Sequence, residues 1–249
     1  MLETDRFYRN WHNGRFTGFT ISYKETDLWI GVDIFNRNML EDTYALVVKL
    51  REEIESFIDG NPAFLTSFEP LNLNDDINRP EVIRQMLFAS TVASVGPMAA
   101  VAGAIAQEVG RFLLDKFDCN EVIVENGGDI FIKNTEPITT AIYAGNSPLS
   151  GKIGLEIPPG VHGVCTSSGT VGHSFSFGKA DAVTIVCDSA SISDAFATAY
   201  CNKVKGEEDI EKVLKSGLNE YVQTIVIVYK DKVGIAGKHK IKLIEESSS

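Results

Sequence analysis

AVTIVCDSASISDAFATAYCNK, residues 182–203, begins with six apolar or β-branched residues and continues with small and aromatic residues at helical spacing. Residues 182–187 are typical of a buried strand, and residues 191–203 are typical of a helix. The sequence therefore predicts a strand that passes into a helix within a few residues. Asp194 and Thr198 are four residues apart near the start of that helix, so they share one of its faces.

These two side chains are candidate metal ligands. A carboxylate and a hydroxyl on one face, completed by a backbone carbonyl, waters and phosphate oxygens, make a reasonable half-site for Mg²⁺. The alternative is structural: an Asp near a helix start is favoured by the helix dipole, and a Thr can bond to its own backbone.

Further strands and helices are predicted on both sides of this unit, without a regular alternation. The strands cover residues 15–23, 28–34, 121–125, 129–133, 139–143, 152–157, 161–165, 223–229 and 232–235, and the helices cover 38–58, 80–94, 99–117 and 208–215. This order favours an α+β fold with mixed or antiparallel sheets packed against helices. We expect one domain over residues 1–245 and a disordered end at 246–249.

Composition limits the function classes. The 249 residues are 44% hydrophobic and 23% charged, which is enough apolar material for one core. A net charge of −11 opposes binding to nucleic acid or to anionic membranes. No apolar leader is evident and the four cysteines form no CxxC pair, so we expect a cytoplasmic protein without a disulfide scaffold or zinc site.

Residues 86–106 carry no charge, yet they are rich in Ala, Ser, Thr and Gly, and Gly96-Pro97 interrupts them. This composition favours two buried helices joined by a turn over a membrane span. Ala102 and Gly103 in the second helix allow another backbone or a ligand to approach closely, although such small faces often serve packing alone.

Two polar segments are candidate ligand contacts. Asn126-Gly127-Gly128, followed by Asp129, fits a tight turn that needs positive φ. Residues 165–181, CTSSGTVGHSFSFGKAD, combine hydroxyls, a thiol, an imidazole and an amine around glycines. Backbone N–H groups and hydroxyls in such a loop can cradle an anion, for which the candidates are Ser167, Ser168, Gly169 and Thr170.

The same loop contains the candidate catalytic residues His173, Cys165 and Lys179. A histidine with suitable neighbours can act as a base, and a thiol near cations or clustered N–H groups holds more thiolate. Structural alternatives exist for each. The loop could satisfy its own polar groups, His173 could be a hydrogen-bonded structural residue, Cys165 could be packed at a strand end, and Lys179 could pair with Asp181.

Three motifs in order resemble the ApbE-like family, the FAD:protein FMN transferases. They are the strand-to-helix unit that ends at Asp194, the segment ENGGDI (125–130), which is similar to the family's N-x-G-G-D-I turn, and the helix at 98–114. The segments VGPMAAVAGAIA, VENGGDI, SPLSGKIGL and CTSSGTVGHSFSFGKADAV resemble one branch more closely. That branch is known mainly from methanogenic archaea and some anaerobic bacteria, and a part in sulfide assimilation has been suggested for it.

The resemblance implies that Asp194 and Thr198 hold Mg²⁺ against the FAD pyrophosphate, and that Asn126, Gly127, Gly128 and Asp129 line the ligand. It implies attack by a hydroxyl of an acceptor protein, which leaves FMN attached and releases AMP. His173 stands where the family has a histidine before the core strand. The family's Lys-Gly pair is replaced by Ala102-Gly103, and its DPxTG-like segment by residues 174–181.

We carry three functional hypotheses. The first is a protein that binds a flavin (FAD or FMN) or another nucleotide with Mg²⁺, extending to a transferase. The second is a sulfur-handling protein that uses Cys165 in sulfide assimilation for homocysteine or cysteine supply. The third is a non-catalytic assembly protein. The partners they imply are a nucleotide-like small molecule, an acceptor protein and a second copy of the chain.

Overall fold

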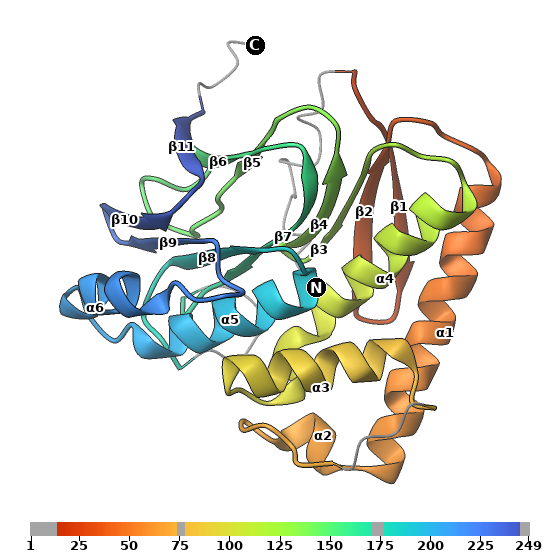
Figure 1. The fold of residues 1–249 in the computed structure, drawn as a ribbon, viewed down its shortest axis with the longest axis horizontal. Helices are drawn as coiled ribbons and strands as arrows, with labels where there is room; N and C mark the ends of the chain where they lie inside the picture. The colour runs from red at the N-terminus through yellow and green to blue at the C-terminus, as the bar shows by residue number, and fades with distance from the viewer. Residues whose placement is uncertain (1–13, 74–77, 171–176, 245–249) are drawn as a thin grey trace.

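Two antiparallel sheets and a layer of helices build the protein, as the computed structural model shows for residues 14–73, 78–170 and 177–244 (Figure 1). The large sheet has the order β1-β2-β3-β4-β7-β8-β9-β10, and the small sheet has the order β11-β6-β5. Every neighbouring pair is antiparallel. The predicted α+β fold is confirmed, with antiparallel sheets.

The large sheet consists of β1 (Thr17–Tyr23), β2 (Thr26–Val32), β3 (Val122–Asn126), β4 (Asp129–Asn134), β7 (Gly160–Ser167), β8 (Ala182–Cys187), β9 (Thr224–Tyr229) and β10 (Lys232–Gly237). The small sheet consists of β5 (Ile138–Ala141), β6 (Ile153–Ile157) and β11 (Lys240–Leu243). The helices are α1 (Asn38–Gly60), α2 (Ala63–Thr66), α3 (Glu81–Ala93), the 3₁₀ helix η2 (Pro97–Ala100), α4 (Val101–Lys116), α5 (Ala190–Lys203) and α6 (Glu208–Gly217).

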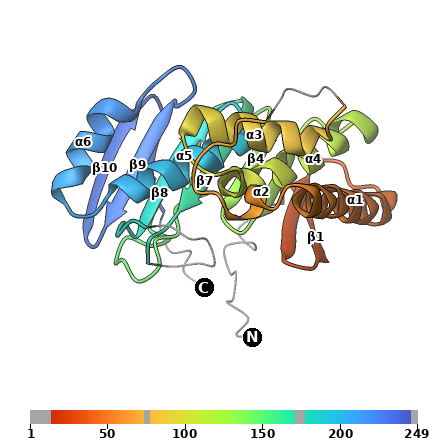
Figure 2. The same cartoon turned by 90° about the horizontal axis from the view of Figure 1, so that it is seen from below.

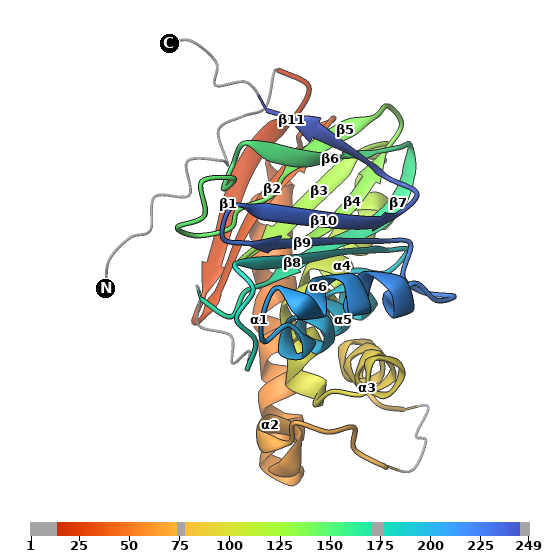
Figure 3. The same cartoon turned by 90° about the vertical axis from the view of Figure 1, so that its left-hand side faces the viewer.

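The large sheet is covered on both faces, with the helices on one side and the small sheet on the other (Figures 1 and 3). Side chains alternate between two cores along each strand, because successive residues of a strand point to opposite faces. In β8, Val183 and Ile185 join the core under the helices, whereas Ala182 and Val186 join the core under the small sheet. This double coverage explains why every residue of β8 is buried and why the strand does not alternate between apolar and charged residues.

The helices lie together across one face of the sheet, as the view from below shows (Figure 2). The break between α3 and α4 falls at Gly96-Pro97, as predicted, and Ser94 ends α3 with φ 57°. A Cβ atom on Gly96 would lie 1.8 Å from the carbonyl oxygen of Ser67, so only glycine fits there. Within the described part of the chain, no single helix is long and apolar enough to cross a membrane; α3 and η2–α4 pass that test only as a pair bent by 106°.

Three features differ from the sequence-based prediction. The short helix α2 and the edge strand β11 were not predicted, because four-residue elements leave little periodicity. The strand β7 continues to Ser167, two residues beyond the predicted end, because Thr166 and Ser167 still pair with Thr184 and Val183 of β8. Ser167, predicted in the polar loop, is therefore a strand residue, and Cys165, predicted both at the end of a strand and at the start of that loop, lies within the strand.

Candidate functional site

A buried group of acidic and thiol side chains forms where β4, β7 and α5 meet. Asp129, the first residue of β4, lies opposite Cys165 of β7 in the ladder. The two-residue turn Gly127-Gly128, with φ of 66° and 106°, allows β3 to reverse directly into β4. The third member, Asp194, comes from the first turns of α5, which starts at an N-cap provided by Ser189. We call Asp129, Cys165 and Asp194 the acidic cluster.

Close helix packing holds Asp194 in place. The backbone N–H of Gly103, near the start of α4, donates to Asp194 Oδ2 at 2.9 Å. A Cβ atom on Gly103 would lie 2.3 Å from the Ala190 carbonyl oxygen and 2.9 Å from Asp194 Cβ. Asn126 Nδ2 donates to the Ala102 carbonyl at 3.1 Å, which ties the β3–β4 turn to the same end of α4. The predicted turn, small-residue pair and helix face are thus brought together.

Burial raises the pKa of both carboxyl groups, and the charge of Asp194 raises that of Asp129 further. The pKa of Asp194 is raised to about 7 by burial, against N–H donors from Gly103 and Ala102 that lower it. Burial, followed by the charge of Asp194, raises the pKa of Asp129 well above its ordinary value. Asp129 Oδ1 is buried and has no hydrogen-bond partner among the residues that the structure describes. The pair therefore binds a proton near neutral pH unless a cation takes its place.

This charge repulsion predicts a stability gain in Asp129→Asn. Raised carboxyl pKa values mean that the folded state binds more protons than the unfolded state, so stability falls as pH rises from about 4 through 7. At pH 8 without metal, the free energy of unfolding of the variant should be about 1–3 kcal/mol higher than that of the parent. Near pH 4 the two free energies should become equal. Urea titrations at both pH values measure this, with the exposed Asp115→Asn as control. Equal parent and variant stabilities at pH 8 would contradict the assignment.

Cys165 lies inside the acidic cluster and not in a loop. All four cysteines are buried, and Cys165 Sγ lies 3.3 Å from the Ala190 carbonyl oxygen. Burial, then the charges of Asp129 and Asp194, raise the pKa of the Cys165 thiol well above its usual value. This environment disfavours the thiolate that sulfur chemistry needs.

Thiol labelling tests the consequence. In the native chain, iodoacetamide should label Cys165 no faster than Cys187 and Cys201, because all three are buried. Peptide mass spectrometry across pH 6–9 measures the labelling rates. The chain unfolded in urea is the control, because all its cysteines are exposed to the reagent. Rapid native labelling with an apparent pKa below that of a free thiol would instead restore the sulfur-handling hypothesis.

The remaining predicted residues fall in three groups. Thr198 is buried one turn after Asp194 on α5, and the buried hydroxyl of Ser167 at the end of β7 has no partner within the described part of the chain. Ser168, Gly169 and Thr170 follow β7, where the backbone N–H of Gly169 donates to the Ala180 carbonyl and Thr170 Oγ1 donates to Asp181 Oδ1. His173 lies outside the described residues, as do residues 246–249 of the predicted disordered end.

Lys179 does not join the acidic cluster. Its side chain is exposed and its backbone N–H donates to the Val204 carbonyl at 2.8 Å. The surface pair with Asp181 considered above is absent among the described residues, because the Asp181 carboxylate accepts from Thr170 Oγ1 and from the Lys230 backbone N–H. A catalytic role for Lys179 stays a prediction without geometric support.

Sequence reasoning missed three supporting side chains. Glu125 is buried next to the turn and accepts from the Gly128 N–H at 2.8 Å. Ser193 donates to the Ile185 carbonyl, and Gln107 Oε1 accepts from the Ala190 N–H at the start of α5. Gln107 could have been noticed as a polar residue four positions after Gly103 in an otherwise apolar helix face.

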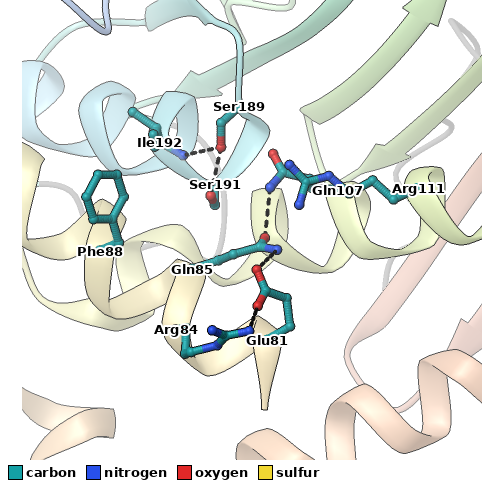
Figure 4. A pocket seen from close by; sticks show the side chains of 9 residues that line it. All are labelled: Glu81, Arg84, Gln85, Phe88, Gln107, Arg111, Ser189, Ser191 and Ile192. Atoms are coloured by element: carbon teal, nitrogen blue, oxygen red, sulfur yellow. Dashed lines mark hydrogen bonds and ion pairs between the residues drawn. The ribbon is translucent and has the colours of Figure 1, made fainter. Parts of the chain in front are cut away.

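An open pocket of about 330 Å³ lies nearby, between α3, α4 and the start of α5 (Figure 4). Its polar wall contains the chain of bonds from Gln107 Nε2 to Gln85 Oε1 and from Gln85 Nε2 to Glu81 Oε1. None of the acidic cluster lines this pocket. We therefore assign the site from the buried carboxylates and not from the cavity. No group of three or more His, Cys, Asp or Glu among the described residues forms a ready-made metal site.

Residues 9–221 match the family model described as AbpE bacteria. The chain belongs to this family. Within it, the chain is 41% identical to the UPF0280 protein MJ1526 of Methanocaldococcus jannaschii over 227 residues, covering 88% of this chain and 89% of that protein. It is 42% identical to a UPF0280 protein of Methanothermobacter thermautotrophicus over 195 residues, covering 76% of this chain and 74% of that protein.

Two solved structures share the AbpE-family fold. The ApbE protein of Thermotoga maritima aligns with a TM-score of 0.56 at 16% identity, over 89% of this chain and 97% of that chain. The flavinyl transferase ApbE of Pseudomonas stutzeri, in its apo form, aligns with a TM-score of 0.56 at 14% identity, over 89% of this chain and 94% of that chain. The resemblance seen in the sequence is thereby confirmed: the chain is an ApbE-like protein of the archaeal UPF0280 branch.

Proposed function

We propose that this protein binds a flavin nucleotide together with Mg²⁺ at the acidic cluster, and that the bound pyrophosphate is the reacting group. The observation that carries the proposal is the buried pair Asp129 and Asp194, in which one carboxylate oxygen has no partner and both pKa values are raised. Two carboxylates held together without a compensating cation are destabilising, and such arrangements are typical of functional sites.

The residues present suit Mg²⁺. The cation prefers oxygen ligands and one or two carboxylates, with waters and substrate phosphates filling its shell. Asp194 and Thr198 are the proposed protein ligands, and the unpartnered Asp129 Oδ1 supports a cation beside them. When bound, Mg²⁺ would neutralise phosphate charge and so favour phosphoryl transfer.

The chain's own residues would orient the ligand. The backbone N–H groups of Gly103 and Ala102 donate to Asp194 and fix the orientation of its carboxylate. Asn126 fixes the glycine turn against α4, which allows the backbone of Gly127 and Gly128 to line the ligand without side chains. Ser167, with its buried hydroxyl unpartnered, supplies a hydrogen-bonding group at the end of β7.

FMN transfer from FAD to an acceptor protein is the specific reaction that we propose. A hydroxyl oxygen of an acceptor protein would form a bond to the flavin-side phosphorus, the pyrophosphate P–O bond would break, and AMP would leave. His173 is proposed to accept the hydroxyl proton. The similarity to the Pseudomonas stutzeri flavinyl transferase supports this step. Ala102 in place of the family's lysine means that a different residue must balance the ligand's charge.

Binding can be tested before chemistry. Titration of the metal-free chain into FAD should quench flavin fluorescence in a saturable manner with Mg²⁺ present and weakly with EDTA. Incubation with FAD and Mg²⁺ then tests turnover through released AMP, measured by chromatography. Absence of Mg²⁺-dependent FAD binding overturns the proposal, whereas binding without AMP release leaves the flavin site and removes the transferase step.

A further inference from the structure

One edge of the large sheet, formed by β1, has no neighbouring strand among the described residues. Proteins usually protect such an edge with charged residues, proline, a bulge or a covering segment. β1 has the sequence TGFTISY, which contains no charge and no proline, and its register with β2 runs from Thr17 to Tyr23 without a bulge. The strand is therefore a ready template for another strand.

The free backbone groups of this edge belong to every second residue of β1. In an antiparallel pair, alternate residues of the outer strand direct their N–H and C=O groups away from the neighbouring strand. The two-residue turn Lys24-Glu25 makes Tyr23 and Thr26 the bonded pair that closes the hairpin, so the outward-directed groups alternate back from there. They are the groups of three exposed residues, Gly18, Thr20 and Ser22.

An apolar stripe borders this edge on the side of the helices. The ring of Phe35 lies against the ring of Phe19, with centroids 5.7 Å apart. The ring of Tyr44 lies against the ring of Tyr23, at 6.0 Å, and Leu40 shares a face of α1 with Tyr44. Phe35, Leu40 and Tyr44 are between 38% and 46% exposed, and α1 and β1 lie at the same end of the molecule (Figures 1 and 2). We call β1 together with these three exposed side chains the β1 face.

Charge indicates what covers the β1 face. The chain has a net charge of −11, so two copies repel each other over most of their surfaces. None of the residues of the β1 face is charged, so a second copy can approach here with less repulsion than elsewhere. The other outer strand of the large sheet, β10, is less suited to pairing, because it begins with Lys232 and contains two glycines.

We propose that two copies of this chain join at the β1 face, with their β1 strands antiparallel around a two-fold axis at Thr20. Thr20 is the middle residue of β1, so this register places Thr20 opposite Thr20 and Gly18 opposite Ser22. These are the residues whose backbone groups point outward, so the groups of each copy bond to those of the other. The strand edge is thus self-complementary, as an interface around a two-fold axis requires.

The charges that flank β1 are compatible with this register. Arg15 precedes the strand and Glu25 follows it at the same distance from Thr20, so each Arg15 lies near Glu25 of the partner subunit. Both residues also form ion pairs within their own chain, Arg15 with Glu121 and Glu25 with Arg51. The ends of the joined strands therefore bring together opposite charges and not like charges.

The size of the interface predicts a reversible dimer. The helices of both copies lie on the same face of the joined sheet, so the apolar side chains of the two β1 faces meet across the axis. A specific interface needs about 1,000 Å² of buried surface in total. Two seven-residue strand edges, each about 23 Å long, together with three large, partly exposed side chains from each copy, come close to that value. We therefore expect the dimer to dissociate on dilution.

The dimer does not depend on the proposed flavin site. β4, which carries Asp129, lies three strands from β1 in the sheet order, which is about 14 Å across the sheet. The acidic cluster therefore stays outside the interface, and each failure can be recognised separately.

Sedimentation velocity of the full chain from about 1 to 200 µM tests the proposal. The parent should pass from monomer to dimer over this range. Thr20→Lys places two like charges opposite each other at the axis and should raise the dissociation constant at least about 10-fold, and Tyr44→Lys should act in the same direction from α1. The matched control is Thr91→Lys, at an exposed threonine of α3, which should dimerise like the parent. A parent that stays monomeric at every concentration overturns the proposal, as does a dimer that neither β1-face variant weakens.

Hydrogen exchange of the unmodified chain covers the case in which a variant does not fold. At high concentration the amides of Gly18, Thr20 and Ser22 should exchange more slowly than at low concentration, because they are bonded only in the dimer. The amides of β10 should exchange at the same rate at both concentrations. A dimer whose β1 amides exchange as in the monomer would place the interface elsewhere and overturn the proposal. Protected β1 amides in the dilute monomer would mean that another segment of the same chain covers the edge, which overturns it as well.

Discussion

Asp194→Ala is expected to weaken Mg²⁺-dependent FAD binding by about 100-fold or more. The substitution removes the carboxylate that the Gly103 N–H orients and that would share the cation with substrate phosphates. Because the buried charge repels Asp129, its removal should not unfold the chain. Fluorescence titration of FAD at fixed Mg²⁺ measures the loss, and thermal unfolding of the metal-free variant verifies the fold.

Two further variants sharpen this experiment. Thr198→Val keeps the shape of the side chain and removes only the hydroxyl, so a loss of about 10-fold is expected if that oxygen binds the cation. Asp115→Ala changes an exposed acid on the far end of α4 and should bind as the parent does. If Asp194→Ala binds FAD and Mg²⁺ like the parent, the metal assignment is wrong.

Gly103→Ala is expected to lower the free energy of unfolding by about 3 kcal/mol and to abolish flavin binding. The added methyl group would lie 2.3 Å from the Ala190 carbonyl oxygen, which is backbone and cannot rotate away. α4 and α5 would have to separate, and the N–H bond from Gly103 to Asp194 would break with them. Urea unfolding and FAD titration measure the two effects, and Gly103→Leu should be more severe than Gly103→Ala.

Gly60→Ala provides the matched control. Gly60 is likewise a helix residue, the last of α1, but a Cβ atom there meets nothing within 4 Å. Alanine at that position should be neutral or slightly stabilising, since it reduces the freedom of the unfolded chain. Gly103→Ala with parental stability would show that α4 and α5 do not pack as closely as described.

The sequence determined most of the elements and two parts of the candidate site. Continuous apolar runs predicted β8 and β9, helical spacing predicted α1 and α4, and Asn126-Gly127-Gly128 predicted the turn between β3 and β4. Each of these signals depends on residues close together in the chain. The pairing of Asp194 and Thr198 on one face follows from helix geometry alone. Short elements such as α2 and β11 have too few residues to show a period.

Only the tertiary structure decided which of the candidate residues lie together. Cys165 and Lys179 belong to one polar segment in the sequence, yet the β7–β8 ladder buries Cys165 beside Asp129 while Lys179 stays exposed. Burial in the folded chain raises the pKa of Asp194, and it raises that of Asp129 together with the charge of Asp194, an acid 65 residues away in the sequence. Burial and long-range contact set charge states and metal affinity, and neither is encoded by the spacing of residues along the chain.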